Sequence, residues 1–326
     1  MARTALITGA TGFVGGHLAE RLAGEGWRVR ALVRATSDTA RLRALGAELA
    51  TGALSDEDAI AAAASGADTV FHLAALTTAP DEDAFRRANV EGTRTVARGA
   101  ARASTRPRRL VYLSSFAACG PAVNGRPRKM DETPAPLTAY GRTKLQGEAA
   151  AREETERAGI ELITLRAPAV YGPGDRAFLP VYRLAKRGLA PIPTGPTRRV
   201  QVIHVQDLVT ALAAAADAPT GTFAVAEPVA HEYGALVDQI GRAARGKDPL
   251  HVPVPAALLR GAGALAERFG GWVGGTGVFS REKADEMLAE AWVCDLAGQE
   301  RLLPRATPLA EGTAETAQWY RAQGWI

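Results

Sequence analysis

Short runs of apolar residues alternate with amphipathic segments through the first half of the chain. The apolar runs read ALIT, VRALV, TVFHL, LVYLS and IELITLR, at residues 5–8, 29–33, 69–73, 110–114 and 160–166. Segments with helical character lie between and after them, at residues 13–25, 38–46, 82–103 and 139–158. Nearly uninterrupted apolar strands are typical of strands buried on both faces. We therefore predict an α/β fold of the Rossmann type, a doubly wound parallel sheet joined by right-handed crossovers.

Glycine and proline interrupt this pattern after Arg166, where the loop APAVYGPGD begins and the predicted elements become shorter. We predict that residues 1–166 form the Rossmann domain and that part of 200–226 returns to it. Residues 167–326 then form mostly a smaller, discontinuous region.

The C-terminal region contains one strong helical pattern. Its apolar positions are 254, 257, 258, 262, 265 and 269. Such a stripe packs on a core or lies on a membrane surface, and we expect core packing. The glycine-rich run that follows, at 270–277, has two interpretations that stay open, a flexible loop over a pocket and a linker.

The composition excludes several classes of protein. Hydrophobic residues make up 47% of the 326 positions and charged residues 23%, which is typical of a chain with a sizeable core. The formal net charge is +4 without a basic tail, so we expect no nucleic-acid partner. The longest aliphatic stretch, residues 208–216, is far shorter than the roughly 20 residues that span a bilayer. Cys119 and Cys294 lack metal-ligand spacing, so we expect two reduced cysteines, no metal site and a cytoplasmic location.

Three glycines stand where the first strand ends and the first helix begins. They are Gly9, Gly12 and Gly15 in the sequence TGATGFVG. Glycine at this turn lets backbone amides approach a pyrophosphate, and the helix N-terminus adds positive partial charge. Because the glycines follow a strand and precede a helix, we predict a dinucleotide-binding site in the Rossmann domain and substrate binding mostly in 167–326.

The end of the second strand bears on the choice of dinucleotide. A carboxylate there accepts hydrogen bonds from a free ribose 2′-hydroxyl, whereas an arginine pairs with a 2′-phosphate. This chain has Arg34 and no acidic residue before Asp38. We predict NADP, and NAD stays the alternative.

A second group of polar residues suits proton transfer. Tyr140 and Lys144 are one helical turn apart and share a face. A nearby ammonium favours the phenolate, which brings a phenol with a pKa near ~10 closer to neutral pH. Ser115 ends the preceding strand, at the carboxyl edge where open α/β sheets bind ligands.

Seven segments in a fixed order carry a resemblance to a known family. They are TGATGFVG (8–15), HLAA (72–75), NVEGT (89–93), YLSSFAACG (112–120), YGRTK (140–144), LRAPAVYGPGD (165–175) and VIHVQDL (202–208). In these segments the chain resembles the extended short-chain dehydrogenases/reductases, the NAD(P)-dependent epimerase/dehydratase superfamily. It looks most similar to the branch of dihydroflavonol-reductase-like and 3β-hydroxysteroid-dehydrogenase-like proteins.

The resemblance implies roles for individual residues. Tyr140 would be the acid/base, Lys144 would lower its pKa and hold the nicotinamide ribose, and Ser115, in preference to Ser114, would orient the substrate oxygen. Asn89 would be structural. The residues implied to contact the cofactor are Gly9, Gly12, Phe13, Val14, Gly15, Arg34, Leu54, Ala74, Ala75, Tyr140, Lys144, Pro168 and Val170.

Two departures from the family pattern are visible. Where many members have an aspartate after the third strand, this chain has Ala53, which puts side-chain recognition of adenine in doubt. Where the family often has a pair of aspartates after a His-Val dipeptide, this chain has Gln206 and Asp207, and we expect no catalytic consequence.

The resemblance implies an NADP(H)-dependent oxidoreductase that interconverts a small-molecule carbonyl compound and an alcohol. The alternative is a nucleotide-sugar epimerase or dehydratase with tightly held NAD. Residues 166–170 read RAPAV and lack the asparagine that sugar enzymes carry there, which favours the oxidoreductase. A cofactor-binding protein without activity is the third hypothesis. A homodimer stays open.

Overall fold

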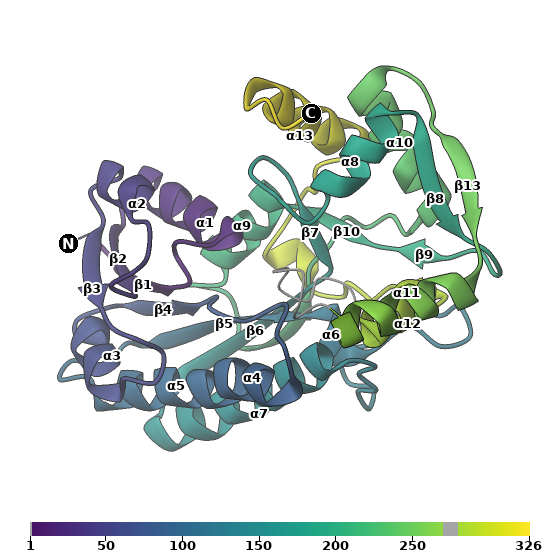
Figure 1. Cartoon of the computed structure of the whole chain (residues 1–326). Coiled ribbons are helices and arrows are strands. Elements are labelled where there is room, and N and C mark those ends of the chain that lie inside the picture. The colour runs from purple at the N-terminus through teal and green to yellow at the C-terminus, as the bar shows by residue number, and fades with distance from the viewer. Residues whose placement is uncertain (1, 270–279) are drawn as a thin grey trace.

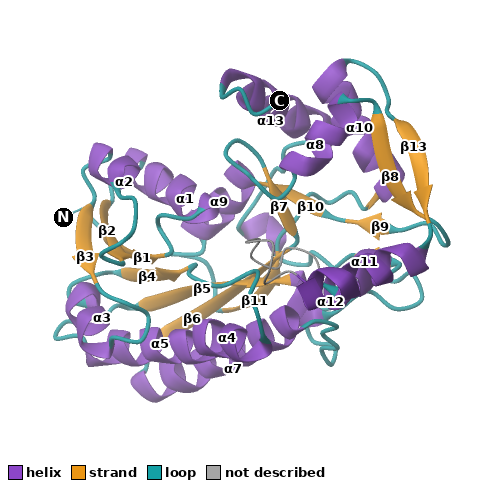
Figure 2. Cartoon of the chain, viewed as in Figure 1, coloured by secondary structure: helices purple, strands orange, loops and turns teal. Residues whose placement is uncertain are grey.

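A seven-stranded parallel sheet forms the base of the molecule, which is described here from a computed structural model covering residues 2–269 and 280–326. The strand order is β11-β6-β5-β4-β1-β2-β3 (Figures 1 and 2). The strands are β1 (Thr4–Thr8), β2 (Arg28–Val33), β3 (Glu48–Thr51), β4 (Thr69–His72), β5 (Arg109–Ser115), β6 (Glu161–Ala167) and β11 (Gly221–Ala224). The predicted Rossmann-type α/β fold is confirmed.

Helices cover both faces of this sheet (Figure 1). One face carries α1 (Phe13–Gly24), α2 (Ala40–Ala44) and α9 (Val205–Ala214). The other face carries α3 (Glu57–Ala64), α4 (Glu82–Arg86), α5 (Gly92–Arg102) and α7 (Ala139–Ala158). The short helix α6 (Phe116–Cys119) follows β5 directly.

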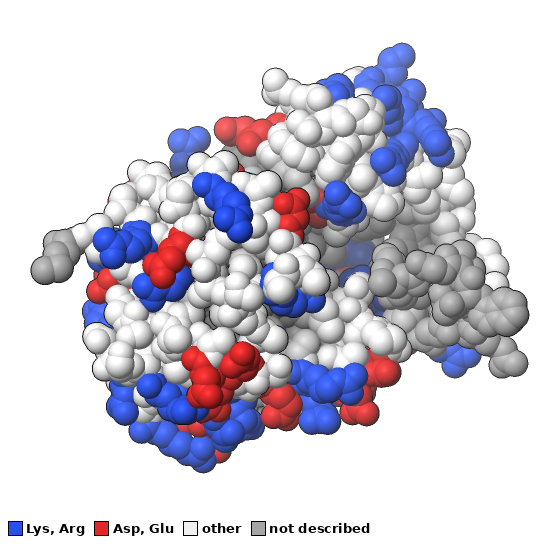
Figure 3. Space-filling view, turned by 60° about the vertical axis from the view of Figure 1, so that its left-hand side comes forward, with Lys and Arg blue, Asp and Glu red and all other residues white. Residues whose placement is uncertain are grey.

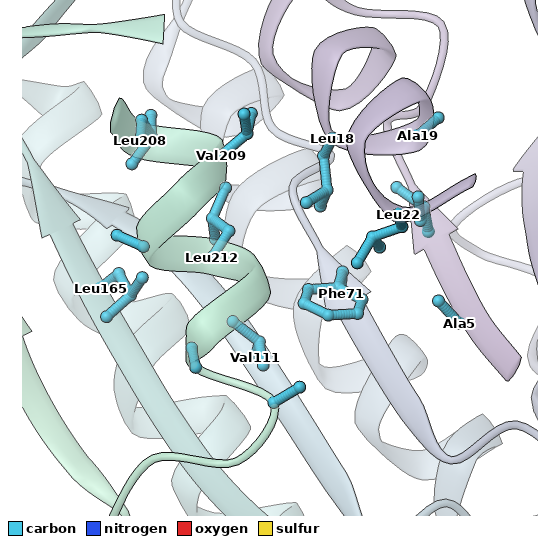
Figure 4. Packing of buried hydrophobic residues seen from close by; sticks show 14 of the residues in the cluster. Ala5, Leu18, Ala19, Leu22, Phe71, Val111, Leu165, Leu208, Val209 and Leu212 are labelled. Atoms are coloured by element: carbon cyan, nitrogen blue, oxygen red, sulfur yellow. The ribbon is translucent and has the colours of Figure 1, made fainter. Parts of the chain in front are cut away.

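The larger core lies between the sheet and the helices α1 and α9. Figure 4 shows Leu18 and Leu22 of α1 facing Val209 and Leu212 of α9 above Phe71 of β4, and all of these residues are buried. A second cluster fills the space between the sheet and α3 and α5. Burial on both faces explains why the strands carry so few polar residues.

Each of the five apolar runs coincides with a sheet strand to within one residue at either end. The sequence pattern did not single out β3 or α3, because β3 is a four-residue edge strand and α3 is a short, alanine-rich helix. The predicted helix at 82–103 is interrupted by one π-helical turn, Arg87–Glu91, which separates α4 from α5.

The remaining elements form a C-terminal lobe beside the carboxyl edge of the sheet (Figure 1). Its helices are α8 (Leu179–Lys186), α10 (Tyr233–Arg245), α11 (Ala256–Phe269), α12 (Arg281–Leu288) and α13 (Leu309–Ala322), with a 3₁₀ turn at Gln299–Arg301. Its strands are β7 (Ala169–Tyr171), β8 (Leu189–Pro193), β9 (Arg199–Val200), β10 (Val202–His204), β12 (His231–Glu232), β13 (Leu250–Val254) and β14 (Ala291–Trp292). Tyr182 and Tyr320 pack edge to face at the centre of its core. Within the described ranges, no helix has both the length and the apolar character needed to cross a membrane.

The expectation that the 254–269 stripe packs on the core is wrong. The helix forms as α11, but Leu258 is 65% exposed and Leu265 is 60% exposed. The neighbouring Leu259 is half-buried and Gly263 is buried, so α11 packs through a different side from the one the stripe indicated. The glycine-rich run at 270–277 lies outside the described residues.

A buried ion pair attaches α7 to the sheet. Arg166 of β6 donates two hydrogen bonds to the carboxylate of Glu148 on α7, at 2.7 and 2.9 Å. Ser114 of β5 donates to the same carboxylate at 2.5 Å. Both charged side chains are at least 94% buried, so each is the counter-charge that the other needs.

We expect Arg166→Leu to lower the free energy of unfolding by about 3–5 kcal/mol, because it leaves the Glu148 carboxylate buried without its counter-charge. Denaturant unfolding measures this change. Glu148→Leu/Arg166→Leu should recover part of the loss. Arg242→Leu, which breaks the exposed pair with Asp248, is the control and should cost no more than about 1 kcal/mol. Equal losses for Arg166→Leu and the control would contradict this account.

Candidate active site

The predicted catalytic residues Ser115 and Tyr140 meet at the carboxyl edge of the sheet. Ser115 ends β5 and caps α6, where its Oγ accepts a hydrogen bond from the backbone amide of Ala117 at 3.1 Å. Its own proton is therefore free for another acceptor. Tyr140 lies in the first turn of α7, which starts here because Thr138 caps it at the amide of Gly141.

Two effects raise the pKa of Tyr140 and one lowers it. Desolvation of the half-buried phenol raises its pKa to about 12, and the adjacent Ser115 hydroxyl acts in the opposite direction. The nearby carboxylate of Glu286 on α12 raises the pKa slightly further. Ser114, the less favoured serine, is buried in the contact with Glu148 and does not face this site.

Lys144 lies one turn further along α7 and is almost completely buried. Its Nζ donates to the carbonyl oxygen of Leu113 at 2.7 Å and lies 4.2 Å from the centre of the Tyr112 ring. Burial lowers the pKa of Lys144 to about 7, although Glu148 acts against the shift. The ammonium and the free amine are therefore both populated near neutral pH.

The backbone of the glycine turn packs so closely that it leaves no room for a Cβ at Gly9 or Gly15. A Cβ on Gly15 would lie 2.1 Å from the carbonyl oxygen of Gly9, and a Cβ on Gly9 would lie 2.8 Å from the amide nitrogen of Ala74. Gly9 also has a φ of +77°, which favours glycine. No side chain caps α1 at Gly12, so the first amides of the helix are available to an anion. This geometry fits a dinucleotide pyrophosphate.

The other predicted cofactor residues surround this turn. Phe13 and Val14 begin α1, and Ala74 and Ala75 follow β4; all four are half-buried. Leu54 follows β3 and packs against Gly92 at the start of α5. Across the sheet edge, the half-buried Pro168 and Val170 follow β6, and Val170 pairs with Ile203 of β10.

A series of buried hydrogen bonds supports the loop after β4. It was not predicted from the sequence. The Thr93 hydroxyl donates to the Asn89 carbonyl, so it accepts the proton of His72 Nε2 at 3.0 Å. His72 Nδ1 then accepts from Thr8 Oγ1 at 2.6 Å, and Thr8 Oγ1 in turn accepts from the Ala74 amide at 3.3 Å. Burial lowers the pKa of His72 to about 3, so the ring stays neutral. The only sequence signal for it was the polar His72 at the end of an apolar strand.

Asn89 has the structural position expected of it. Its side-chain amide exchanges two hydrogen bonds with the backbone of Leu76, at 2.8 and 3.0 Å. A third contact reaches Thr143 on α7 at 3.3 Å. Asn89 therefore connects the loop after β4 to the helix that carries Tyr140 and Lys144.

Arg34 is exposed at the carboxyl end of β2 and lines a polar hollow. Ser37, Thr39 and Arg43 line the same hollow. Two guanidinium groups and two hydroxyls suit a phosphate group, since all of them donate hydrogen bonds. The only acidic side chain near this strand end in the sequence, Asp38, accepts from the amide of Ala40.

Gln206 and Asp207, which stand where the family often has two aspartates, make contacts between neighbouring elements. Gln206 contacts His17 Nδ1 at 3.2 Å, while His17 Nε2 contacts the Pro173 carbonyl at 2.9 Å. Asp207 accepts two hydrogen bonds from Thr307, at 2.7 and 2.9 Å. Together they attach α9 to α1 and to the segment before α13.

An apolar pocket of about 170 Å³ lies in the C-terminal lobe, between α8, α10, α11, α12 and the β8–β13 pair. Among the described residues that line it, Tyr233 alone has a polar side-chain group and none is charged. Met287 of α12 lines it, and the preceding Glu286 is near Tyr140. A further α12 residue, Glu282, accepts from the amide of Ala139 at 2.6 Å. Helix α12 therefore lies between the pocket and the start of α7, a relation that no sequence pattern indicated.

The arrangement can perform proton transfer beside a bound dinucleotide. It offers a phenol, a serine hydroxyl and a lysine with a lowered pKa at one edge of the sheet. In the described part of the chain, no cluster of His, Cys, Asp and Glu side chains could hold a metal ion.

Comparisons with known proteins agree with this geometry. A model of the NAD dependent epimerase/dehydratase family matches residues 5–226. The ceramide reductase of Caulobacter vibrioides is 33% identical over 98% of this chain and 95% of its own. A putative dihydroflavonol 4-reductase of Synechocystis sp. is 32% identical over 64% of this chain and 61% of its own. The structure of MoeE5 in complex with UDP-glucose and NAD has a TM-score of 0.74 at 26% identity, covering 98% of this chain and 99% of that one.

We expect Gly15→Ala to weaken dinucleotide binding and to cost about 1–3 kcal/mol of stability, since its Cβ collides with the Gly9 carbonyl. Calorimetric titration with NADPH and denaturant unfolding measure the two effects. Gly24→Ala, at the other end of α1, is the matched control because a Cβ there meets no atom within 4 Å. Unchanged NADPH affinity in Gly15→Ala would remove the glycine turn from the binding site.

Proposed function

The chain belongs to the NAD dependent epimerase/dehydratase family, and from this membership we propose that it is an NADP(H)-dependent oxidoreductase. Its reaction interconverts a ketone or aldehyde and the corresponding alcohol. The observation that carries this proposal is the contact between Ser115 and Tyr140 one turn before the buried Lys144.

In the direction of reduction, Tyr140 gives its phenolic proton to the substrate oxygen. Ser115 donates a hydrogen bond to the same oxygen while its Oγ accepts from the Ala117 amide. The Lys144 ammonium favours the phenolate that remains. In the direction of oxidation, the phenolate accepts the proton of the alcohol.

The glycine turn and the free amides of α1 would hold the pyrophosphate of the cofactor, and Arg34 would pair with the 2′-phosphate of NADP. Ala74, Ala75, Pro168 and Val170 would line the rest of its path. The bound nicotinamide supplies or accepts the hydride.

The substrate we propose is apolar. The described lining of the C-terminal pocket contains no charged residue, whereas a nucleoside diphosphate needs cationic partners. Two relatives whose names describe reductases, one of them acting on ceramide, also favour net reduction. The second candidate, a nucleotide-sugar epimerase with tightly held NAD, is favoured by the similarity to MoeE5.

The test is a set of apolar cyclic and aryl ketones and aldehydes incubated with NADPH. We expect loss of NADPH absorbance with at least one compound and reversal with its alcohol at high pH, because a reductase accumulates oxidised cofactor in step with product. An epimerase shows no net redox change. Interconversion of a UDP- or dTDP-sugar without consumption of NADPH, together with release of NAD on denaturation, would establish the second candidate instead.

We expect Tyr140→Phe to reduce turnover by at least ~10²-fold with little change in NADPH affinity, since the substitution removes the proton donor and keeps the ring. Steady-state kinetics and NADPH titration measure the two quantities. Tyr171→Phe is the matched control, because the buried Tyr171 hydroxyl has no hydrogen-bond partner in the described chain. Near-normal turnover in Tyr140→Phe would exclude this residue as the acid/base.

We expect NADPH to bind roughly tenfold or more tightly than NADH, because an arginine–phosphate contact contributes about 1.5–3 kcal/mol. Titration of both cofactors at one ionic strength measures the ratio. Arg34→Asp should erode or reverse the preference. Arg28→Asp, an exposed arginine at the opposite end of β2, should leave it intact. Equal affinities in the unmodified protein would end the assignment of Arg34.

A further inference from the structure

Large apolar side chains are exposed mainly on one part of the C-terminal lobe. Of the ten such side chains in the described chain, seven lie between the start of β8 and the end of α12. Five of them form what we call the apolar face: Leu189 (41% exposed), Leu250 (68%), Val252 (37%), Leu258 (65%) and Leu265 (60%). Of the other two, Met287 lines the apolar pocket and Val229 lies in the loop before β12.

The strand pairing joins the β8 and β13 members of this face. The two strands are parallel, with Leu189 opposite Leu250 and Pro191 opposite Val252. Residues two apart in a strand point to the same side, so these side chains share one side of the β8–β13 pair. Leu189 and Pro191 also line the apolar pocket, and the pocket extends to Leu259 of α11.

Helix α11 begins two residues after β13 ends and carries the remaining exposed leucines. Leu258, Ala262 and Leu265 follow the spacing of one helical stripe and are all exposed. A leucine stripe facing water is unusual in a helix that has a core to pack against. The stripe is therefore available to an apolar phase outside the protein.

Four cations surround the start of the β8–β13 pair. Lys186 and Arg187 directly precede β8, and Lys247 lies three residues before Leu250. Arg245 reaches the same place, because a Cβ on Gly188 would lie 2.4 Å from its guanidinium. All four side chains are exposed, and none has an ion-pair partner among the residues described. Figure 3 shows blue side chains gathered in the upper right of its view, on the side of the molecule that carries the C-terminal lobe.

We propose that the apolar face docks on an anionic lipid surface, with α11 lying in the plane of the interface. Leucines beside unpaired lysines and arginines match acyl chains beside anionic headgroups. A second copy of this chain fits less well, since it would bring the same four cations to the contact.

Docking gives the pocket a route to lipid. Leu189 and Met287 line the pocket and are exposed, so the pocket opens on this part of the lobe. An apolar substrate would then enter from the bilayer without crossing water. This last step rests on the proposed function, whereas lipid binding does not.

Vesicle flotation of the full-length chain tests the docking without any substrate. The vesicles are phosphatidylcholine alone, and phosphatidylcholine with phosphatidylglycerol in equal parts. We expect binding to the mixed vesicles, weakening as salt is added, and much weaker binding to phosphatidylcholine alone.

Two double variants test the surface. Lys186→Glu/Arg187→Glu and Leu258→Asp/Leu265→Asp should each reduce binding to the mixed vesicles by about tenfold or more. Arg106→Glu and Val123→Asp, exposed positions outside the lobe, are the matched controls for charge and apolarity and should bind like the unmodified protein.

Three results would overturn the proposal. They are absence of flotation with the mixed vesicles, equal loss in the controls, and a dimer by light scattering that becomes a monomer in Leu258→Asp/Leu265→Asp without any vesicle binding. The last result would assign the face to self-association. None of these results bears on NADPH oxidation, so the docking and the proposed function fail separately.

Discussion

The buried pair of Glu148 and Arg166 is the constraint on which the site geometry depends. It joins α7 to β6, and Ser114 joins β5 to the same carboxylate. Lys144 lies one turn before Glu148 on α7, and Tyr140 lies one turn before Lys144. The Glu148–Arg166 pair therefore fixes where Tyr140 and Lys144 lie relative to the sheet edge, although it contacts neither of them. A pair of this kind tolerates little movement, because any separation leaves a charge without solvent or partner.

The environment of Lys144 shows how the fold combines rigidity with acid–base chemistry. A neutral His72, the Tyr112 ring and the Leu113 carbonyl surround or approach its buried amine. Burial lowers the pKa of Lys144, and the Glu148 carboxylate limits this decrease. Helix α7 thus carries both Glu148, which attaches it to the sheet, and Lys144, whose pKa is lowered by burial.

The sequence predicted the parts of this protein that follow periodic or local rules. The apolar runs identified five of the seven sheet strands, and the glycine turn at 9–15 has the close backbone approaches that its spacing indicated. Contacts between distant segments could not be read in the same way. The hydrogen bonds that connect Thr8, His72 and Thr93 join three elements, and none of these residues belongs to a local pattern that predicts the contact. The stripe on α11 was wrongly placed on the core, because periodicity identifies an apolar side but does not say what lies opposite it.

The π-helical turn at Arg87–Glu91 sets how the side chains of α4 are rotated about the helix axis relative to those of α5. A five-residue turn contains about one residue more than an α-helical turn, and each residue of an α-helix advances the side chains by about 100°. The extra residue lets Asn89 bond the backbone of Leu76 while Phe85, on the preceding segment, lies 6.1 Å from the Tyr140 ring. Loss of a single residue here would regularise the helix and turn Phe85 away from Tyr140 by roughly a quarter of a revolution. An insertion or deletion in this turn would therefore rotate the side chains of α4 that face the Tyr140 phenol and leave the rest of the fold unchanged.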